Sequence, residues 1–135
     1  MFKKLGALLL IINCISCHKS NQQACGTQVC TYLFAIITVH FADRNGQGVS
    51  VQNYSAVNQR THEKLLPTAQ LDAYPGTYAV ADDNMRSKFS NEGDDVVVSG
   101  TSPTTGQTKT VTLKISGGCN CHVNKESGDN TVVFD

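Results

Sequence analysis

The segment Tyr32-Leu-Phe-Ala-Ile-Ile-Thr-Val-His-Phe-Ala42 carries the strongest structural signal in this chain of 135 residues. Every second residue from Leu33 to Phe41 is apolar, whereas the residues between them are mixed and include Thr38 and His40. A period of two with many β-branched and aromatic residues is typical of a β-strand that packs one face into a core. The segment therefore predicts a strand over residues 32–42, with Leu33 and Phe41 at the two ends of its buried face.

Shorter segments of the same kind follow, and residues that favour turns separate them. The strand-like segments cover residues 49–58, 77–81, 86–90, 95–100, 108–116, 119–125 and 131–134. Residues 127–130 predict a hairpin turn between the last two segments, and residues 60–66 fit either a helical turn or a loop. We therefore expect an all-β protein in which residues 25–135 form a single antiparallel β-sandwich of about seven strands, of the prealbumin or immunoglobulin type.

The N-terminus has the layout of an export signal. Two lysines precede the apolar run Leu5–Ile12, and two cysteines, Cys14 and Cys17, follow it. The run is far shorter than the ~20 apolar residues that span a bilayer, and its length suits the apolar core of a signal peptide. We therefore expect residues 1–16 to be a signal peptide.

Residues 1–17 resemble the signal sequence of bacterial lipoproteins, in which a cysteine after small residues becomes the lipidated N-terminus of the mature protein. Ser16 is small where cleavage requires a small residue, so the resemblance assigns lipidation to Cys17, with Cys14 as the alternative. It implies that lipid holds the chain at a membrane of the cell envelope, because two or more acyl chains anchor a protein firmly. Residues 17–24 would then be the lipidated cysteine and a polar tether.

The number of cysteines agrees with cleavage before Cys17. The chain has six cysteines, and this cleavage with lipidation leaves four that can pair, namely Cys25, Cys30, Cys119 and Cys121. Exported chains form disulfides in an oxidising compartment. In an extended segment Cys119 and Cys121 would lie ~6.6 Å apart, near the upper limit for a disulfide. We therefore expect Cys25 and Cys30 to pair with Cys119 and Cys121, and either order fits the sequence.

The segment Cys119-Asn120-Cys121-His122 has a second interpretation as a metal site. Two thiolates and an imidazole bind zinc or copper, and His18, His40 or His62 could complete the set. One closely spaced pair of cysteines is a weak metal signal, because structural zinc sites usually use two spaced pairs. Of the three interpretations of these cysteines, structural disulfides are favoured over a metal site, and a metal site over a redox-active pair. We therefore expect no cofactor. His122 is expected to point outward from a strand.

Two other kinds of candidate site are oxygen-rich turns, which could bind calcium, and one histidine beside a carboxylate, which could act as a general base. Calcium prefers loops that offer many oxygen ligands. Three places have such residues: Asp43, Asn45 and Gly46; Asp82, Asp83 and Asn84; and Asp94 and Asp95. Such clusters are usually solvated turns whose side chains bond their own backbone. His62 lies beside Glu63, but a charged surface loop explains this pair better than a general base. No hydrolase, phosphate-loop or dinucleotide motif occurs, so no catalytic residue is expected.

Two further segments resemble the transthyretin-like domains found beside carboxypeptidases and in secreted bacterial proteins. They are Phe41-Ala-Asp-Arg-Asn-Gly-Gln-Gly-Val-Ser-Val51 and Gly76-Thr-Tyr-Ala-Val80. The shared pattern is a strand, an Asp-x-x-Gly turn, a Val-rich strand and a Gly-x-Tyr strand. The resemblance implies a prealbumin-like sandwich and no catalytic residues.

These features predict a non-enzymatic, lipid-anchored envelope or surface protein that binds a protein or glycan partner through its loops. Loss of Lys3 and Lys4 with the signal leaves nine basic against eleven acidic residues, so no basic stripe for nucleic acid is expected. One alternative is an envelope metal-binding protein that uses Cys119, Cys121 and His122. Another is an accessory domain of a separate hydrolase.

Overall fold

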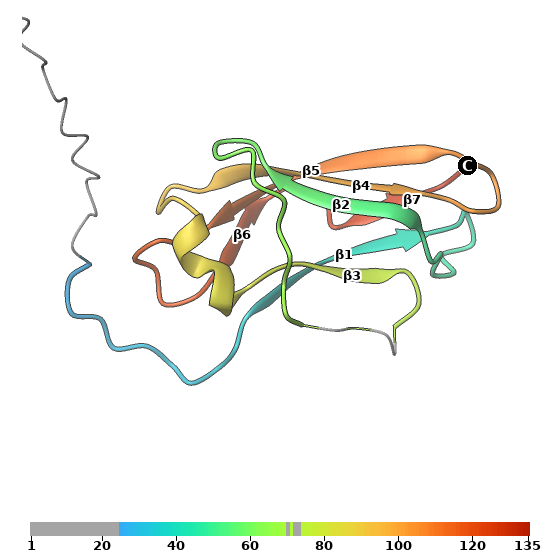
Figure 1. The fold of residues 1–135 in the computed structure, drawn as a ribbon. Helices are drawn as coiled ribbons and strands as arrows, with labels where there is room; N and C mark the ends of the chain where they lie inside the picture. The colour runs from blue at the N-terminus through green and yellow to red at the C-terminus, as the bar shows by residue number, and fades with distance from the viewer. Residues whose placement is uncertain (1–24, 70, 72–73) are drawn as a thin grey trace, which may run out of the picture.

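The structure is a computed structural model, and it describes residues 25–69, 71 and 74–135. These residues form seven strands and one short helix, arranged as two packed layers (Figure 1). The all-β sandwich that the sequence predicts is therefore confirmed. The predicted signal peptide and tether, with Cys14, Cys17 and His18, lie outside the described residues. Within the described part of the chain, no helix has the length and apolar character needed to cross a bilayer.

The first sheet has the strand order β3-β1-β7, with β1 (Ile36–Ala42) in the centre. β1 runs antiparallel to β3 (Thr77–Asp82) and parallel to β7 (Thr131–Val133). The parallel pair arises because β7 enters from the other sheet. The predicted hairpin turn at residues 127–130 is therefore wrong, since the strands on either side of it belong to different sheets.

The second sheet has the strand order β2-β4-β5-β6 and is antiparallel throughout. Its members are β2 (Gln52–Asn58), β4 (Asp94–Thr101), β5 (Thr108–Ser116) and β6 (Asn124–Ser127). β4 and β5 form a long hairpin whose register is continuous from Asp94 opposite Ile115 to Thr101 opposite Thr108. β5 matches the predicted strand over 108–116, and Leu113 and Ile115 from it lie in the core.

The core lies between the two sheets and centres on Phe41 of β1, which is fully buried. The Phe41 ring meets Tyr54 and Tyr78 edge-on and stacks on Phe134, with ring centroids 5.8–6.4 Å apart. Gly100 of β4 lies opposite this ring, and a Cβ there would come within 2.9 Å of Phe41 Cζ. The aromatic cluster therefore fills the centre of the sandwich and requires a residue without a side chain in the facing strand.

β1 is shorter than the predicted strand of residues 32–42. It begins at Ile36, which pairs with Asp82 at the end of β3. Residues N-terminal to Ile36 have no strand of the first sheet beside them, so residues 32–34 are exposed instead of buried. The prediction that Leu33 lies on the buried face is therefore wrong, whereas Phe41 at the other end is correctly placed.

Two predicted strands at the same end of the sandwich have other structures. Residues 83–88 form a 3₁₀ helix, η1, and Phe89 at its end is buried, so the predicted strand over 86–90 is wrong. Residues 117–123 form a bend before β6, so the predicted strand over 119–125 is also wrong except for its last two residues, which begin β6. Gly117 packs against η1, where a Cβ would lie 2.4 Å from the Arg86 carbonyl oxygen. The close packing of η1 on the bend therefore requires a residue without a side chain at position 117. Residues 60–66 form a loop.

Candidate functional site

Two disulfides join the start of the described chain to the bend at residues 117–123. Cys25 pairs with Cys119 and Cys30 pairs with Cys121, with Cα–Cα distances of 5.2 and 5.3 Å. This is one of the two pairings that the sequence left open. We call residues 25–35 the N-terminal strap. It runs outside both sheets, past η1, before it enters β1 (Figure 1).

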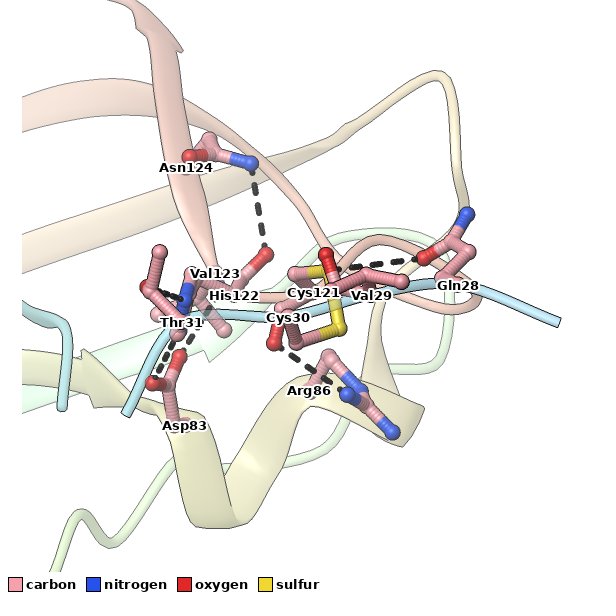
Figure 2. The surroundings of a disulfide bond; sticks show 10 residues. All are labelled: Gln28, Val29, Cys30, Thr31, Asp83, Arg86, Cys121, His122, Val123 and Asn124. Atoms are coloured by element: carbon pink, nitrogen blue, oxygen red, sulfur yellow. Dashed lines mark hydrogen bonds and ion pairs between the residues drawn. A yellow bond between two sulfur atoms is a disulfide. The ribbon is translucent and has the colours of Figure 1, made fainter. Parts of the chain in front are cut away.

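Beside the second disulfide, three side chains form a hydrogen-bonded chain, which we call the clasp: Thr31, His122 and Asp83. Figure 2 shows it next to the sulfur atoms of Cys30 and Cys121. The Thr31 Oγ1 atom lies 2.9 Å from His122 Nε2, and His122 Nδ1 lies 2.7 Å from Asp83 Oδ2. Because the ionised carboxylate can only accept, Nδ1 donates to it, and Nε2 shares the second hydrogen bond with the threonine hydroxyl.

Asp83, the first residue of η1, joins the strap to the bend. Its Oδ2 atom accepts from the Ala35 amide at 2.9 Å, and its Oδ1 atom accepts from the Val123 amide at 2.9 Å. Partial burial acts to raise the pKa of Asp83. The hydrogen bonds from Ala35, His122 and Val123 outweigh burial, so the pKa lies below its ordinary value. The carboxylate is therefore ionised at neutral pH and holds both segments.

The clasp has the order of groups found in hydrolases, a hydroxyl, an imidazole and a carboxylate. Nucleophilic catalysis also needs donors that stabilise the oxyanion and a place for the substrate. Thr31 lies on the exposed strap, and neither of the two surface hollows described below includes it. Asp83 also binds two backbone amides, which is the pattern of a structural junction. The contacts therefore support a role in fastening the strap.

Two hollows mark the surface of the sandwich. A shallow one beside the second disulfide is rich in amide side chains; its lining includes Gln28, Asn91, Asn120, Asn124 and Glu126. A groove of about 530 Å³ lies along β2 and β3, where Tyr54, Leu66, Tyr74 and Tyr78 contribute to its wall. The first offers hydrogen-bond donors and acceptors, and the second offers polar and apolar surface in similar amounts, with several aromatic rings in its wall.

Of the described histidines considered to complete a metal site, neither His40 nor His62 lies in the bend with Cys119 and Cys121. Both sulfurs are in disulfides, so they are not thiolate ligands. His40 bonds Thr77 within the first sheet, and His62 lies in the 60–66 loop. Among the described residues, no group of three or more His, Cys, Asp or Glu side chains is placed to hold a metal ion. His122 is partly buried in the bend, so its predicted outward position on a strand is wrong.

The acidic clusters considered for calcium bind protein groups. Asp43 Oδ1 accepts from the amides of Asn45 and Gln47 in its own turn. Asp82 is fully buried, caps η1 through the Asn84 amide and accepts from Thr68. The prediction that Asp82 lies in a solvated turn is therefore wrong. Its buried carboxylate accepts hydrogen bonds from protein donors, most of them backbone amides, where a solvated one would accept them from water.

Asp94 is the centre of a second buried network. The Arg60 guanidinium binds both carboxylate oxygens, at 2.8 and 2.9 Å, while Asn58 and Ser90 donate to them as well. Burial acts to raise the pKa of Asp94, but these donors outweigh it and hold the pKa far below its usual range. The predicted solvated turn is therefore wrong for Asp94 too. Glu63, the carboxylate considered as a partner of His62, forms an ion pair with Lys88 instead.

Sequence reasoning did not identify the clasp, although one signal was present. Thr31 follows Cys30 and His122 follows Cys121, so a disulfide between these cysteines brings the next residues together as well. Asp83 was considered only as a calcium ligand. Nothing in the pattern predicted that η1 would bring it to His122, because the segment after it looked like a strand.

Comparison of the chain with protein-family models, with curated proteins and with solved structures found no match.

Proposed function

We propose that the protein is a lipid-anchored β-sandwich of the cell envelope that binds a protein or glycan partner through its loops and has no enzymatic activity of its own. Three features support the proposal: the lipoprotein-like sequence at residues 1–17, the two disulfides, and a strand-rich fold whose acidic clusters serve structural roles. Disulfides persist in oxidising compartments outside the cytosol.

The observation that carries the proposal is the position of the first disulfide. Cys25 lies eight residues after Cys17, and its bridge reaches Cys119. A pull on a lipid at Cys17 would therefore enter the fold through a covalent cross-link to the bend, and would not peel β1 from the first sheet. The second bridge repeats this attachment at Cys30. Such a reinforced junction suits a domain tethered at its N-terminus.

The hollow beside the second disulfide supports a polar partner. Amide side chains offer both donors and acceptors, which match the hydroxyl groups of a sugar or the backbone of a peptide. Asn91 and Asn120 each use one polar atom within the fold, in bonds to the Cys119 amide and to Ser116. Gln28, whose Oε1 atom lies 3.6 Å from the Cys121 sulfur, also lines this hollow.

Metabolic labelling with a radioactive fatty acid tests the anchor. Wild type should incorporate label, Cys17→Ala should incorporate none, and Cys14→Ala should match wild type as the control. Intact-mass measurement of the mature protein should show two disulfides. Equal labelling of wild type and Cys17→Ala, or reduced thiols in full-length protein recovered from the cytosol, would refute the proposal.

A further inference from the structure

The N-terminal strap exposes apolar side chains between Val29 and Phe34. Val29 and Tyr32 are fully exposed, and Leu33 and Phe34 are 77% and 52% exposed. Ile36, the first residue of β1, adds to the same run at 40% exposure. Single exposed apolar residues are ordinary, but a contiguous group of them marks an interaction surface.

The strap is held in place although its side chains are exposed. The two disulfides fix Cys25 and Cys30, the clasp fixes Thr31, and Asp83 exchanges hydrogen bonds with the backbone of Ala35. The backbone around Tyr32, Leu33 and Phe34 is therefore fixed from both sides. A surface whose backbone is already ordered loses little conformational entropy when it docks.

The strap carries no formal charge. Residues 20–42 contain no Asp, Glu, Lys or Arg. Transfer of this surface from water to an apolar environment would therefore bury no ionised group, whose burial would oppose docking. Tyr32 has an apolar ring and a polar tip, which is the combination enriched where a membrane meets water.

The strap is also the described part of the chain that lies closest in sequence to the proposed lipid. The eight residues from Cys17 to Cys25 span at most ~29 Å when extended. A lipid at Cys17 would keep the start of the strap within that distance of the bilayer. This argument favours a lipid surface over a protein partner that would have to find the same patch from solution.

We propose that the N-terminal strap docks on the surface of the bilayer, with Tyr32, Leu33 and Phe34 in the interfacial region. The inference rests on the proposed lipid anchor and goes beyond it, because it assigns the strap a contact of its own. The contact would act as a second membrane signal beside the acyl chains, and it would orient the sandwich with η1 and the bend toward the membrane.

Vesicle partition of unlipidated protein tests the contact separately from the anchor. The protein is residues 18–135, exported behind a cleavable signal so that the disulfides form; all the contacts described above lie within it. The vesicles are phosphatidylcholine. The strap variant is Tyr32→Ser/Leu33→Ser/Phe34→Ser, and the matched control is Leu66→Ser/Tyr74→Ser/Val133→Ser, which removes three exposed apolar side chains elsewhere. The strap variant should lower the partition coefficient at least about tenfold, and the control should not.

A tryptophan probe reports the depth of the contact, because the chain has no tryptophan of its own. With vesicles, Tyr32→Trp should show blue-shifted emission that brominated lipid quenches, whereas Tyr74→Trp should show neither change. Both variants replace exposed rings, so both should retain the wild-type circular dichroism.

Three results would overturn the proposal. They are no partition of the wild-type protein, equal partition of the strap variant and the wild type, and a Tyr32→Trp emission shift that depends on protein concentration without lipid. The last result would assign the strap to a second copy of the chain. Fatty-acid labelling of the full-length protein is unaffected by these results, so failure of the anchor and failure of the contact are distinguished.

Discussion

Asp94 illustrates how one residue changes its role between sequence and structure. In the sequence it closes a polar turn, but in the structure it begins β4 and receives donors from β2, the 60–66 loop and the segment after η1. Asn58, also fully buried, shares a hydrogen bond with it. The network therefore joins the end of β2 and the loop after it to the start of β4, which lies more than thirty residues further along the chain.

We predict that Asp94→Asn lowers stability and weakens its dependence on pH. The pKa of Asp94 in the folded protein lies far below the unfolded value of ~3.9, so the ionised carboxylate stabilises the fold fully above about pH 4. That contribution decreases as the pH falls below the unfolded pKa, and it is gone once the pH has fallen through the folded pKa. The variant should lose about 2 kcal/mol at pH 7 and should show a smaller drop between pH 7 and pH 3.

Urea unfolding at the two pH values measures both effects. Asp83, whose pKa is also lowered, remains in the variant and should leave part of the acid sensitivity. A drop in stability of the same size in both proteins would show that Asp94 does not contribute to acid unfolding.

His122 links the strap to Asp83, and its removal should loosen the strap without unfolding the sandwich. Because the disulfides and the Ala35 amide still hold the strap, His122→Ala should cost only about 1 kcal/mol. Hydrogen exchange of the Ala35 and Val123 amides should accelerate, while exchange in β4 should not change. His122→Gln, which retains a donor, is the control and should restore part of the protection.

The same variants distinguish fastening from catalysis. A fluorophosphonate ester is a probe that modifies activated hydroxyl groups covalently. If it labelled Thr31 in the wild type but not in His122→Ala, the clasp would be a nucleophilic site, and the fastening role would be wrong.

At the scale of elements, strand content was predicted better than strand ends. Alternation located β5 at residues 108–116, because its pattern reflects burial of one face and exposure of the other. The start of β1 could not be predicted in this way. Leu33 continues the apolar alternation, but whether it is buried depends on where β3 ends, which is a property of another segment.

Gly128, in the connection between β6 and β7, lies close to the backbone of β5. Its φ is +98°, and a Cβ there would lie 2.3 Å from the Thr112 carbonyl oxygen. Gly106, in the β4–β5 turn, has a φ of +70°, and a Cβ there would meet no atom within 4 Å. A substitution at Gly106 would therefore cause backbone strain alone, whereas a substitution at Gly128 would cause backbone strain and a steric clash.

We predict that Gly128→Ala destabilises the protein more than Gly106→Ala. Gly106→Ala should cost about 1 kcal/mol, the usual penalty for an L-residue in the left-handed region. Gly128→Ala adds a clash with backbone of β5 and should cost about 2 kcal/mol or more. Thermal unfolding of both variants measures the difference, and equal midpoints would contradict the steric argument.

At the scale of the whole molecule, the disulfides tie the N-terminal strap to the bend before β6. They join residues separated by 94 and 91 positions. In the chain-entropy model, one loop of this length stabilises by about 4–5 kcal/mol. The two loops are nearly the same, so the second bridge adds much less than the first.

We predict that Cys30→Ser/Cys121→Ser keeps the fold and lowers the unfolding midpoint moderately, whereas removal of both bridges lowers it strongly. The physical reason is that either bridge alone closes most of the same loop. Calorimetry of the single-bridge, no-bridge and wild-type proteins measures this. If the two bridges contributed equally and additively, the loop-closure explanation would be wrong.

The sequence by itself determined the all-β class, the alternation of the long strands and the cysteines available for pairing. These properties follow from local patterns, since side chains alternate along any strand and cysteine count does not depend on folding. Only the tertiary structure decided which cysteines pair, that Asp83 meets His122, and that the strap is exposed beside β1. Each of these depends on segments far apart in the chain, whose distance is set by how the two sheets pack and not by any pattern within one segment.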